Sequence, residues 1–296
     1  MSYLSRKLLM TGFFERTRLV WSNSIMTAAM LDWDSIAYGN GIFVSGADQI
    51  GNNMYYSSNG ISWTLGSHTG YSTDEWNAIG YGNGRFVALS LTYATYSDDG
   101  INWISTSLGF NATFNGIVYG NGKYIGVSGN RIVSSSNGIA WSTVLLGPPF
   151  ATKLITFGEG RFLITSYSTN QALYSDNGTT WNTVTLPISP SSSWNGATYG
   201  NGKFFIVSSD GDIVYSDDCI TWNTSSIGTG MDVLAITYGG GRFVAVGGAA
   251  RSAYSYDGIT WIDNPMNLAG QWNSMTYGEG RFVVVGENAT RCAFTI

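Results

Sequence analysis

Residues 76–103 read WNAIGYGNGRFVALSLTYATYSDDGINW, and this stretch decides the fold. Apolar residues alternate with small or polar ones over residues 84–90, which is the period of a half-buried β-strand. The pair Asn83-Gly84 accepts the positive φ angles of a type I′ turn and therefore predicts a tight hairpin. A second turn at residues 98–100 separates two further short strands. The stretch predicts a unit of four antiparallel strands.

The same unit recurs along the whole chain of 296 residues. An aromatic-Gly-x-Gly motif returns at intervals of 43, 38, 38, 42, 39 and 39 residues, and six copies are followed by a segment that ends in Trp. Four-stranded units with a period of about 40 residues are typical of β-propeller blades. The sequence therefore predicts an all-β, seven-bladed β-propeller whose motif aromatics are Tyr38, Tyr81, Tyr119, Phe157, Tyr199, Tyr238 and Tyr277.

The two ends of the chain predict how the ring closes. The seventh unit lacks a Trp-ended fourth strand, whereas residues 18–23 supply one that contains Trp21. Trp21 precedes Trp33 by 12 residues, and Trp103 likewise precedes Phe114, the equivalent aromatic of the next unit, by 11 residues. We expect this N-terminal strand to complete the last blade and to remove exposed sheet edges. Residues 18–296 then form the propeller, and residues 1–17 form an N-terminal arm.

Composition and charge disfavour several classes of partner. Charged residues make up 11% of the chain, the net charge is −5 and the isoelectric point is about 4.7. Nucleic acids and anionic membrane surfaces both attract basic faces, so we expect neither as a partner. No run of about 20 apolar residues predicts membrane insertion, and the apolar run near the N-terminus is too short for a convincing signal peptide. Cys219 and Cys292 fall in different repeats, which disfavours a disulfide between them.

The segments YSDDGINW, YSDNGTTW and YSYDGITW resemble the Asp-box, or BNR, repeat, whose pattern is Ser-x-Asp-x-Gly-x-Thr-Trp. The YGNGRFVALS-like half of each unit resembles repeat proteins of phages and environmental bacteria. The resemblance implies a propeller on a virion surface or in an extracellular setting. It also implies that the Asp box is a structural hairpin, with Asp98, Asp176, Asp217 and Asp257 tying its turn.

A basic residue follows the Gly-x-Gly turn in six of the units. We expect each cation to pair with an acid of its own blade, and a ring of cations for an acidic partner is the alternative. The six residues are Arg85, Lys123, Arg161, Lys203, Arg242 and Arg281.

The variable loops lie opposite these uniform turns, and variable loops on a rigid scaffold are where binding residues gather. Most units begin their innermost strand with an aromatic residue followed by a small polar one. Amides beside aromatic rings suit sugars at the mouth of the central channel. The alternative is that the Trp packs between blades and the Asn caps a strand. The candidate ligand-binding residues are Asp34, Asn77, Asn115, Asn195, Asn273, Trp76, Trp194 and Trp272.

Catalytic chemistry is poorly represented. Arg131, Arg251 and Arg291 share one repeat position and could converge on a carboxylate or phosphate as an anion site, although scattered surface arginines are the alternative. A sialidase-like hydrolase would also need a glutamate-supported tyrosine nucleophile, which is not evident. The single histidine, His68, is expected to be a solvated loop residue, so the sequence predicts no metal site and no cofactor.

The N-terminal arm is rich in apolar residues that a propeller does not need. Apolar side chains of an ordered arm have to be buried somewhere. We expect the arm to dock on another virion or surface protein, and packing on blade seven is the alternative. The candidate docking residues are Tyr3, Leu8, Leu9, Phe13 and Phe14.

Together these features predict a non-enzymatic structural or adhesion protein of a virion surface, associated with a phage capsid or tail. It would present the propeller to a host surface, including host glycans, or to another protein. A soluble carbohydrate-binding lectin is the first alternative, and a sialidase-like glycoside hydrolase is the second.

Overall fold

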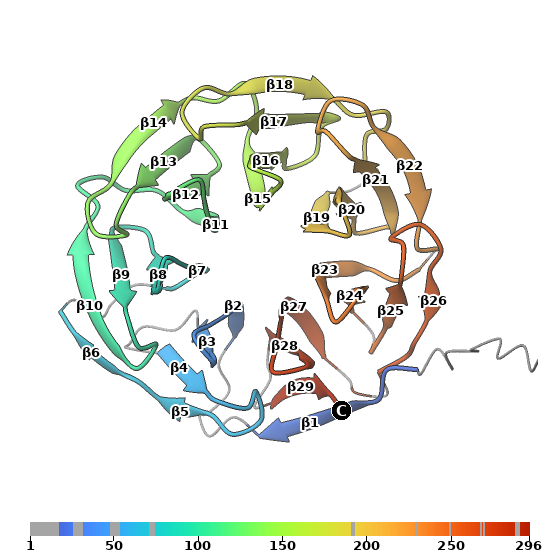
Figure 1. The fold of residues 1–296 in the computed structure, drawn as a ribbon, viewed down its shortest axis with the longest axis horizontal. Coiled ribbons are helices and arrows are strands. Elements are labelled where there is room, and N and C mark those ends of the chain that lie inside the picture. The colour runs from blue at the N-terminus through green and yellow to red at the C-terminus, as the bar shows by residue number, and fades with distance from the viewer. Residues whose placement is uncertain are drawn as a thin grey trace, which may run out of the picture.

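The computed structural model describes residues 18–25, 32–47, 54–70, 75–190, 193–228, 230–248, 250–266, 268, 270–287 and 291–296. The described residues form 29 β-strands and no helix. The strands make seven sheets in a ring around a central axis, which confirms the predicted all-β, seven-bladed propeller (Figure 1).

In each blade the first strand lies nearest the axis and the last lies at the outer rim (Figure 1). Consecutive strands pair in antiparallel register, as in a β-meander. Blades one to three consist of β2 (Trp33–Gly39), β3 (Ile42–Ala47), β4 (Met54–Ser57) and β5 (Thr64–Leu65); β7 (Ala78–Gly82), β8 (Arg85–Leu89), β9 (Tyr93–Ser97) and β10 (Asn102–Ser107); and β11 (Phe114–Gly120), β12 (Lys123–Ser128), β13 (Arg131–Ser135) and β14 (Ser142–Leu146). Blades four to six consist of β15 (Thr152–Gly158), β16 (Arg161–Ser166), β17 (Gln171–Ser175) and β18 (Asn182–Thr185); β19 (Trp194–Gly200), β20 (Lys203–Ser208), β21 (Asp212–Ser216) and β22 (Asn223–Ser226); and β23 (Val233–Gly239), β24 (Arg242–Gly247), β25 (Ser252–Ser255) and β26 (Ile262–Asp263).

Blade seven is built from both ends of the chain. It joins β27 (Gln271–Gly278), β28 (Arg281–Glu287) and β29 (Arg291–Thr295) to β1 (Trp21–Ile25). β1 pairs antiparallel with β29, with Trp21 opposite Thr295. The indole Nε1 of Trp21 donates a hydrogen bond of 2.9 Å to Ser252 Oγ in blade six. The prediction that the N-terminal strand completes the last blade is therefore confirmed.

The repeated aromatic-Gly pair explains how neighbouring blades approach each other. A Cβ atom added to Gly158 would lie 2.0 Å from Cγ of Tyr199, which belongs to the first strand of the next blade. The same packing occurs at all seven blade junctions, and Gly278 beneath Tyr38 closes the ring. Because the ring of each aromatic occupies the place of the missing Cβ, the motif requires glycine for contact between blades.

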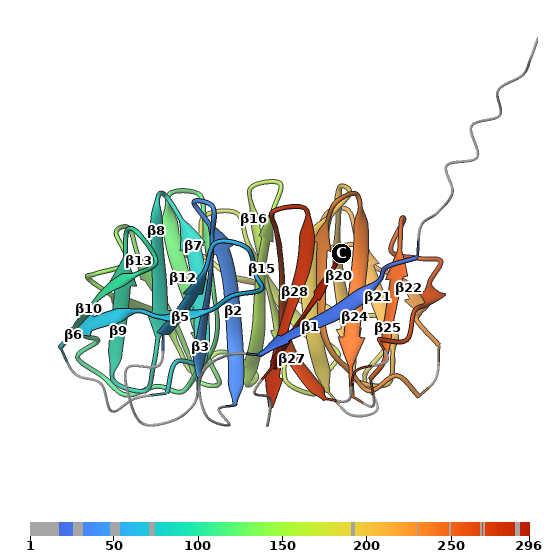
Figure 2. The ribbon, with the colours of Figure 1, turned by 90° about the horizontal axis from the view of Figure 1, so that it is seen from below.

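The propeller has two faces, seen edge-on in Figure 2. The hairpin face carries the turn between the first and second strands of each blade and, in blades one to six, the turn between the third and fourth strands. The loop face carries the remaining connections. On the hairpin face Asn83 and Gly84 have φ angles of 48° and 78°, the left-handed pair that a type I′ turn requires, as the sequence predicts.

In blades one to six the second turn on the hairpin face is held by hydrogen bonds to its own side chains. In blade two, Gly100 N donates to Ser97 Oγ at 2.9 Å, and Ile101 N and Asn102 N each donate to Asp99 Oδ1 at 2.8 Å. The equivalent residues of the other complete turns accept the same pair of bonds: Asn59, Asn137, Asn177, Asp218 and Asp257. The expected role of Asp257 is therefore correct. The prediction that Asp98, Asp176 and Asp217 tie the turn is wrong, because the residue after each of them does so.

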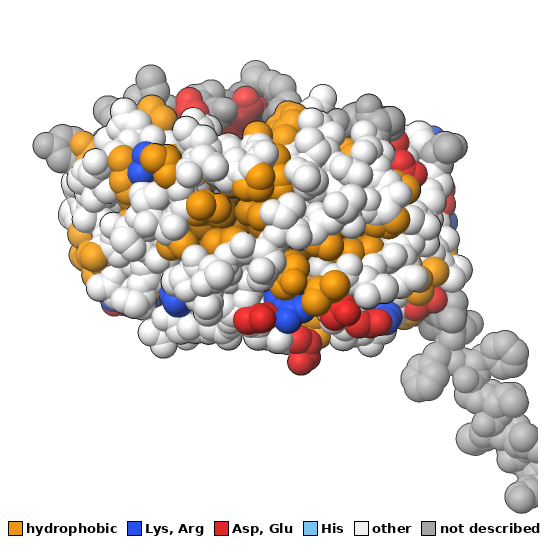
Figure 3. All heavy atoms as spheres, turned by 90° about the horizontal axis from the view of Figure 1, so that it is seen from above, with side chains coloured by type: hydrophobic (Ala, Val, Ile, Leu, Met, Phe, Trp, Pro, Cys, Tyr) orange, Lys and Arg blue, Asp and Glu red, His pale blue; other side chains and the backbone are white. Residues whose placement is uncertain are grey.

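These three acids instead form ion pairs with the basic residues of their own blades. Arg85 Nε lies 2.6 Å from Asp98 Oδ1 and also donates from Nη1 to Asn137 O of the next blade at 2.8 Å. The other two pairs are Arg161–Asp176 and Lys203–Asp217. In blade six a tyrosine, Tyr256, takes the place of the acid, and the guanidinium of Arg242 lies 5.3 Å from its ring centroid. Figure 3 shows blue and red side chains side by side along this edge of the molecule.

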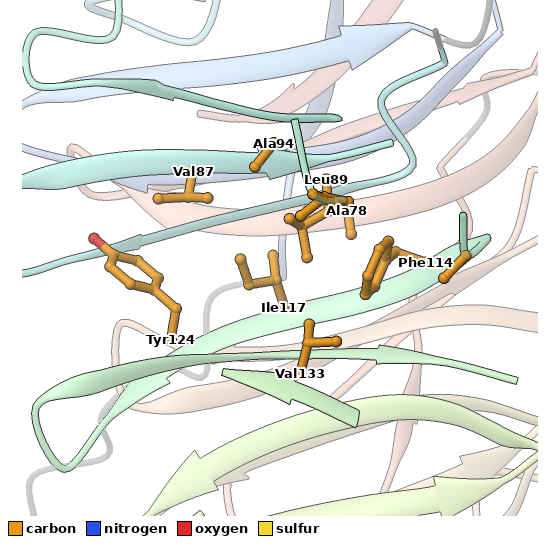
Figure 4. Close-up of a cluster of buried hydrophobic side chains, with 10 residues drawn as sticks. Ala78, Val87, Leu89, Ala94, Phe114, Ile117, Tyr124 and Val133 are labelled. Atoms are coloured by element: carbon orange, nitrogen blue, oxygen red, sulfur yellow. The ribbon is translucent and has the colours of Figure 1, made fainter. Parts of the chain in front are cut away.

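The hydrophobic core lies between adjacent blades. Phe114 and Tyr124 of blade three, both about 1% exposed, pack against the apolar face of blade two. The cluster drawn in Figure 4 joins Ala78, Val87, Leu89 and Ala94 of blade two to Phe114, Ile117, Tyr124 and Val133 of blade three. Each blade is thus stabilised by its two neighbours.

One strand was not expected from the sequence. β6 (Ser67–Thr69) crosses from blade one and pairs in parallel with β10 at the outer edge of blade two. Within it, His68 Nε2 lies 2.8 Å from Ser105 Oγ and 3.0 Å from Thr95 Oγ1, and burial lowers the pKa of the imidazole. The expectation that His68 is a solvated loop residue is therefore wrong, because its ring holds the crossover against blade two.

Candidate functional site

A cavity of about 340 Å³ lies on the loop face, where the innermost strands of blades one to four begin. We call it the mouth cavity. Polar side chains and aromatic rings share its wall. Its lining residues are Asp34, Glu75, Asn77, Phe114, Asn115, Lys153, Leu154 and Tyr167.

A β-bulge near the start of the innermost strand explains how polar side chains reach this cavity. In six of the seven blades the pairing of the first two strands shifts register directly after its first residue pair. The residues left in the shift include Asp34, Asn115 and Lys153. A bulge leaves a residue out of the ladder and changes the direction of its side chain. The bulge therefore positions Asp34, Asn115 and Lys153 at the mouth cavity.

Three of the five predicted polar residues lie in the cavity wall, and the other two bond to residues of that wall. Asp34, Asn77 and Asn115 line the mouth cavity. Asn195 accepts a hydrogen bond from Lys153, and Asn273 Nδ2 donates to Asp34 Oδ1 at 3.2 Å.

Two of these asparagines also join blades. Asn115 Nδ2 donates to Thr152 O at 3.3 Å, and Asn195 Nδ2 donates to Val233 O at 2.8 Å, each acceptor being the first residue of the next innermost strand. Both asparagines therefore bond to the first residue of a neighbouring strand, as the alternative expects, and Asn115 lines the cavity as well.

The predicted tryptophans do not reach the cavity. Trp76 and Trp194 are 0% exposed and Trp272 is 2% exposed, so protein atoms cover both faces of each indole. Trp194 Nε1 donates to Thr169 O at 2.9 Å. We therefore correct the candidate site: these three indoles pack between blades and offer no platform for a ligand.

The exposed aromatic ring of the cavity is instead that of Tyr167, which the repeat pattern does not indicate. Tyr167, in the loop after β16, is 53% exposed. Its ring centroid lies 4.6 Å from Nζ of Lys153, which is a cation–π contact. Lys153 stands where most blades carry Asp or Asn, and this departure from the repeat was the available signal. No sequence signal indicated the position of Tyr167, because its loop differs in every blade.

Among the described residues of the cavity lining, Lys153 is the one lysine or arginine. Its Nζ donates to Asn195 Oδ1 at 2.6 Å and to Ser193 Oγ at 3.4 Å. Burial lowers the pKa of this ammonium group. Within the part of the chain that the structure describes, the ion pairs are Arg85–Asp98, Arg161–Asp176 and Lys203–Asp217, and Lys153 is in none of them. Its partners in the structure are neutral.

The three candidate anion-site arginines are not brought together. Arg131 is the first residue of β13, and Arg251 lies directly before β25. These two strands lie on opposite sides of the ring (Figure 1). Arg131 donates to Thr143 Oγ1 at 2.7 Å and stacks over Phe110 at 4.2 Å. The side chain of Arg291 lies outside the described residues. The alternative of scattered arginines therefore fits Arg131 and Arg251.

The arm residues Tyr3, Leu8, Leu9, Phe13 and Phe14 lie outside the described residues. Across the described ranges, no group of three or more His, Cys, Asp or Glu side chains is placed to hold a metal ion. In the same ranges no helix is long and apolar enough to span a membrane.

No protein-family model matches the chain, and no curated protein is similar to it in sequence. Its fold is similar to solved structures. A catalytically inactive virginiamycin B lyase from Staphylococcus aureus with quinupristin has a TM-score of 0.81 and 13% identity, covering 94% of this chain and 99% of that one. YCF48 bound to D1 peptide has a TM-score of 0.75 and 13% identity, with 93% and 96% covered. The RRP9 WD40 repeats have a TM-score of 0.74 and 8% identity, with 92% and 96% covered. At these identities the similarity establishes the seven-bladed fold alone.

Proposed function

We propose that this propeller is a non-enzymatic adhesion protein that binds a saccharide ligand in the mouth cavity of its loop face. The observation that carries the proposal is the cavity itself: about 340 Å³ at the axis, lined by amides, carboxylates, one ammonium group and an exposed tyrosine. Binding sites are commonly concave, with a few polar groups that fix the orientation of the ligand.

The lining matches a hydroxylated ligand. Sugar hydroxyls donate to carboxylate and amide oxygens, which Asp34, Glu75, Asn77 and Asn115 supply. The apolar side of a sugar ring packs on an aromatic face, and Tyr167 offers one that is half exposed. The rest of the surface is poor in charge, since only 11% of the residues are charged. A glycan of a host surface is the ligand class that these groups suit.

The setting on a virion surface, as a capsid or tail component, is a wider part of the same proposal. It is supported by the resemblance of the repeats to phage and environmental bacterial sequences. Similar folds include one described as bound to a peptide, so protein partners of the propeller form part of the proposal too. The N-terminal arm, residues 1–17, is the segment proposed to dock on such a partner.

The test is a glycan array probed with the full-length protein and four variants. We expect specific glycans to bind the wild type, and Tyr167→Ala and Asn77→Ala to weaken that binding at least tenfold. Leu146→Ala and Asn182→Ala are matched controls, because both residues are exposed and neither lines the cavity. Binding that survives both cavity variants would contradict the proposed site. An array without any specific glycan would contradict the function and leave protein docking as the proposal.

A glycoside hydrolase is the second candidate, and one observation favours it: two carboxylates, Asp34 and Glu75, line the same cavity. Glycosidases commonly use a pair of carboxylic residues. Incubation with 4-nitrophenyl glycosides tests it. We expect no release of 4-nitrophenol above the uncatalysed rate. Release by the wild type that is lost in Glu75→Gln would replace adhesion with hydrolysis.

A further inference from the structure

The charges of the mouth cavity are separated around the ring. Asp34 belongs to blade one, and Glu75 lies just before the innermost strand of blade two. The ammonium of Lys153 belongs to blade four. No ion pair joins Lys153 to either acid among the described residues. The cavity therefore has a negative side and a positive side, with the amides of Asn77 and Asn115 between them.

Among the described residues, no carboxylate pairs with the half-buried ammonium group of Lys153. Its contacts are an amide oxygen at 2.6 Å, a hydroxyl at 3.4 Å and the ring of Tyr167 at 4.6 Å. Buried charges are normally paired, and a carboxylate or sulfate adds a Coulombic attraction to the ammonium that neutral acceptors do not supply. An anionic group that entered the cavity would meet a cation already positioned by three neutral neighbours.

We propose that the ligand of the mouth cavity is an acidic saccharide, with one negative group that pairs with Lys153 Nζ. Its hydroxyls then donate to Asp34, Asn77 and Asn115 on the other side. The inference rests on the proposed saccharide-binding function and adds the charge of the sugar. Asp34 and Glu75 repel the negative group, so the sugar binds in one orientation, with its acid toward blade four.

The experiment is isothermal titration of the full-length protein with three methyl β-D-glycosides: the glucoside, the glucuronide and the glucoside 6-sulfate. The first two differ mainly in the carboxylate, and the third separates a carboxylate from a sulfate as the source of charge. We expect at least one acidic sugar to bind about tenfold more tightly than the neutral one, because one charge-assisted bond is added. The preference should shrink as ionic strength rises.

Variants identify the group responsible. We expect Lys153→Gln to abolish the ratio between acidic and neutral sugars, and Lys153→Arg to keep most of it. Lys123→Gln is the matched control, since Lys123 opens β12 next to the hairpin face and does not line the cavity. In the wild type the preference should disappear as the pH rises through the pKa of Lys153, which burial places below that of an exposed lysine.

The outcomes separate the inference from the function on which it rests. If neutral and acidic sugars bind the wild type equally, or if the preference survives in Lys153→Gln, the acidic ligand is refuted while saccharide binding stands. If none of the three sugars binds and the glycan array is also empty, both proposals fail.

Discussion

The hairpin face and the loop face are made by the same seven repeats, yet the hairpin face is uniform from blade to blade and the loop face is not. On the hairpin face the turns keep one pattern of hydrogen bonds, whether the tying residue is Asp99, Asn137 or Asn177. On the loop face the residue in the bulge changes from one blade to the next, for example from Asn115 to Lys153 to Leu234. The uniform face maintains the ring, and the variable face is where a ligand can be recognised.

The cavities of the two faces follow the same division. Two cavities among the hairpin-face residues have volumes of about 160 and 150 Å³. The second of these is lined by Arg85 and Asp98, which already neutralise each other. The mouth cavity is about twice as large, and its lysine has neutral partners. Size and an unneutralised charge, taken together, distinguish the candidate binding site from the structural turns.

The largest expected effect separates two neighbours in sequence, Trp76 and Asn77. Trp76 is fully buried, so Trp76→Ala should lower the free energy of unfolding by about 3–5 kcal/mol, through lost burial and the cavity that remains. Asn77 lines the mouth cavity, and Asn77→Ala should change that free energy by less than about 1 kcal/mol while weakening ligand binding. Guanidinium chloride denaturation measures both. Equal destabilisation by the two variants would mean that Asn77 contributes as much to the stability of the fold as the buried Trp76.

A smaller effect tests the blade junction against the turn next to it. In Gly158→Ala the new methyl group would overlap the ring of Tyr199, so we expect a loss of about 2–3 kcal/mol from overpacking. In Gly160→Ala nothing lies within 4 Å of the new atom, and the cost of its positive φ angle should be about 1 kcal/mol. Thermal denaturation compares the two. A larger loss for Gly160→Ala would refute the account of the aromatic-Gly motif.

The smallest effect concerns acid stability of the hairpin face. Burial alone would raise the pKa of Asp99, but hydrogen bonds from Asn102 and Ile101 outweigh it and lower this pKa to about 2. The carboxylate therefore stabilises the fold above the ordinary aspartate pKa of about 3.9, and this contribution is lost as the pH falls from about 4 to about 2. Asn fills the same role in three other turns, so Asp99→Asn should keep the turn and remove its share of the pH dependence.

Because the carboxyl of Asp99 is exposed, solvent screens the effect, and we expect it to be below about 1 kcal/mol. Urea denaturation at pH 2, 3, 4 and 6 compares the two proteins. A variant that follows the wild type at every pH would show that this turn contributes nothing to acid stability.

The sequence predicted the features that recur in every repeat. Seven aromatic-Gly-x-Gly motifs and the Trp-ended strands fixed the number of blades and the closure by β1, because each motif packs on an identical neighbour. It also pointed to Asp34, Asn77 and Asn115 as residues at the axis. The sequence did not predict the site residues that depart from the repeat, Tyr167 and Lys153. Tyr167 lies in a loop of no fixed length, and the bulge that turns Lys153 toward the axis is a property of strand pairing that residue types alone do not reveal.

Trp76 and Trp194 were wrongly assigned to the site because one sequence pattern fits two structural roles. An aromatic next to an Asn fits both a sugar platform and a blade junction, and only the structure, in which both indoles are fully buried, shows that the Trp packs between blades. The same ambiguity affected the Asp-box acids. The sequence places two adjacent acids at residues 98 and 99, and only the structure shows that the second ties the turn while the first binds Arg85.

The most direct test of the central claim is hydrogen–deuterium exchange of the full-length protein with and without saturating methyl β-D-glucuronide. The mouth cavity is the proposed binding site, so we expect slower exchange at residues 75–77, 114–116, 153–155 and 167–169, with unchanged exchange at the turns of residues 97–103 and 216–222. Protection at the turns, or no protection at all, would contradict the claim that the loop face binds the ligand.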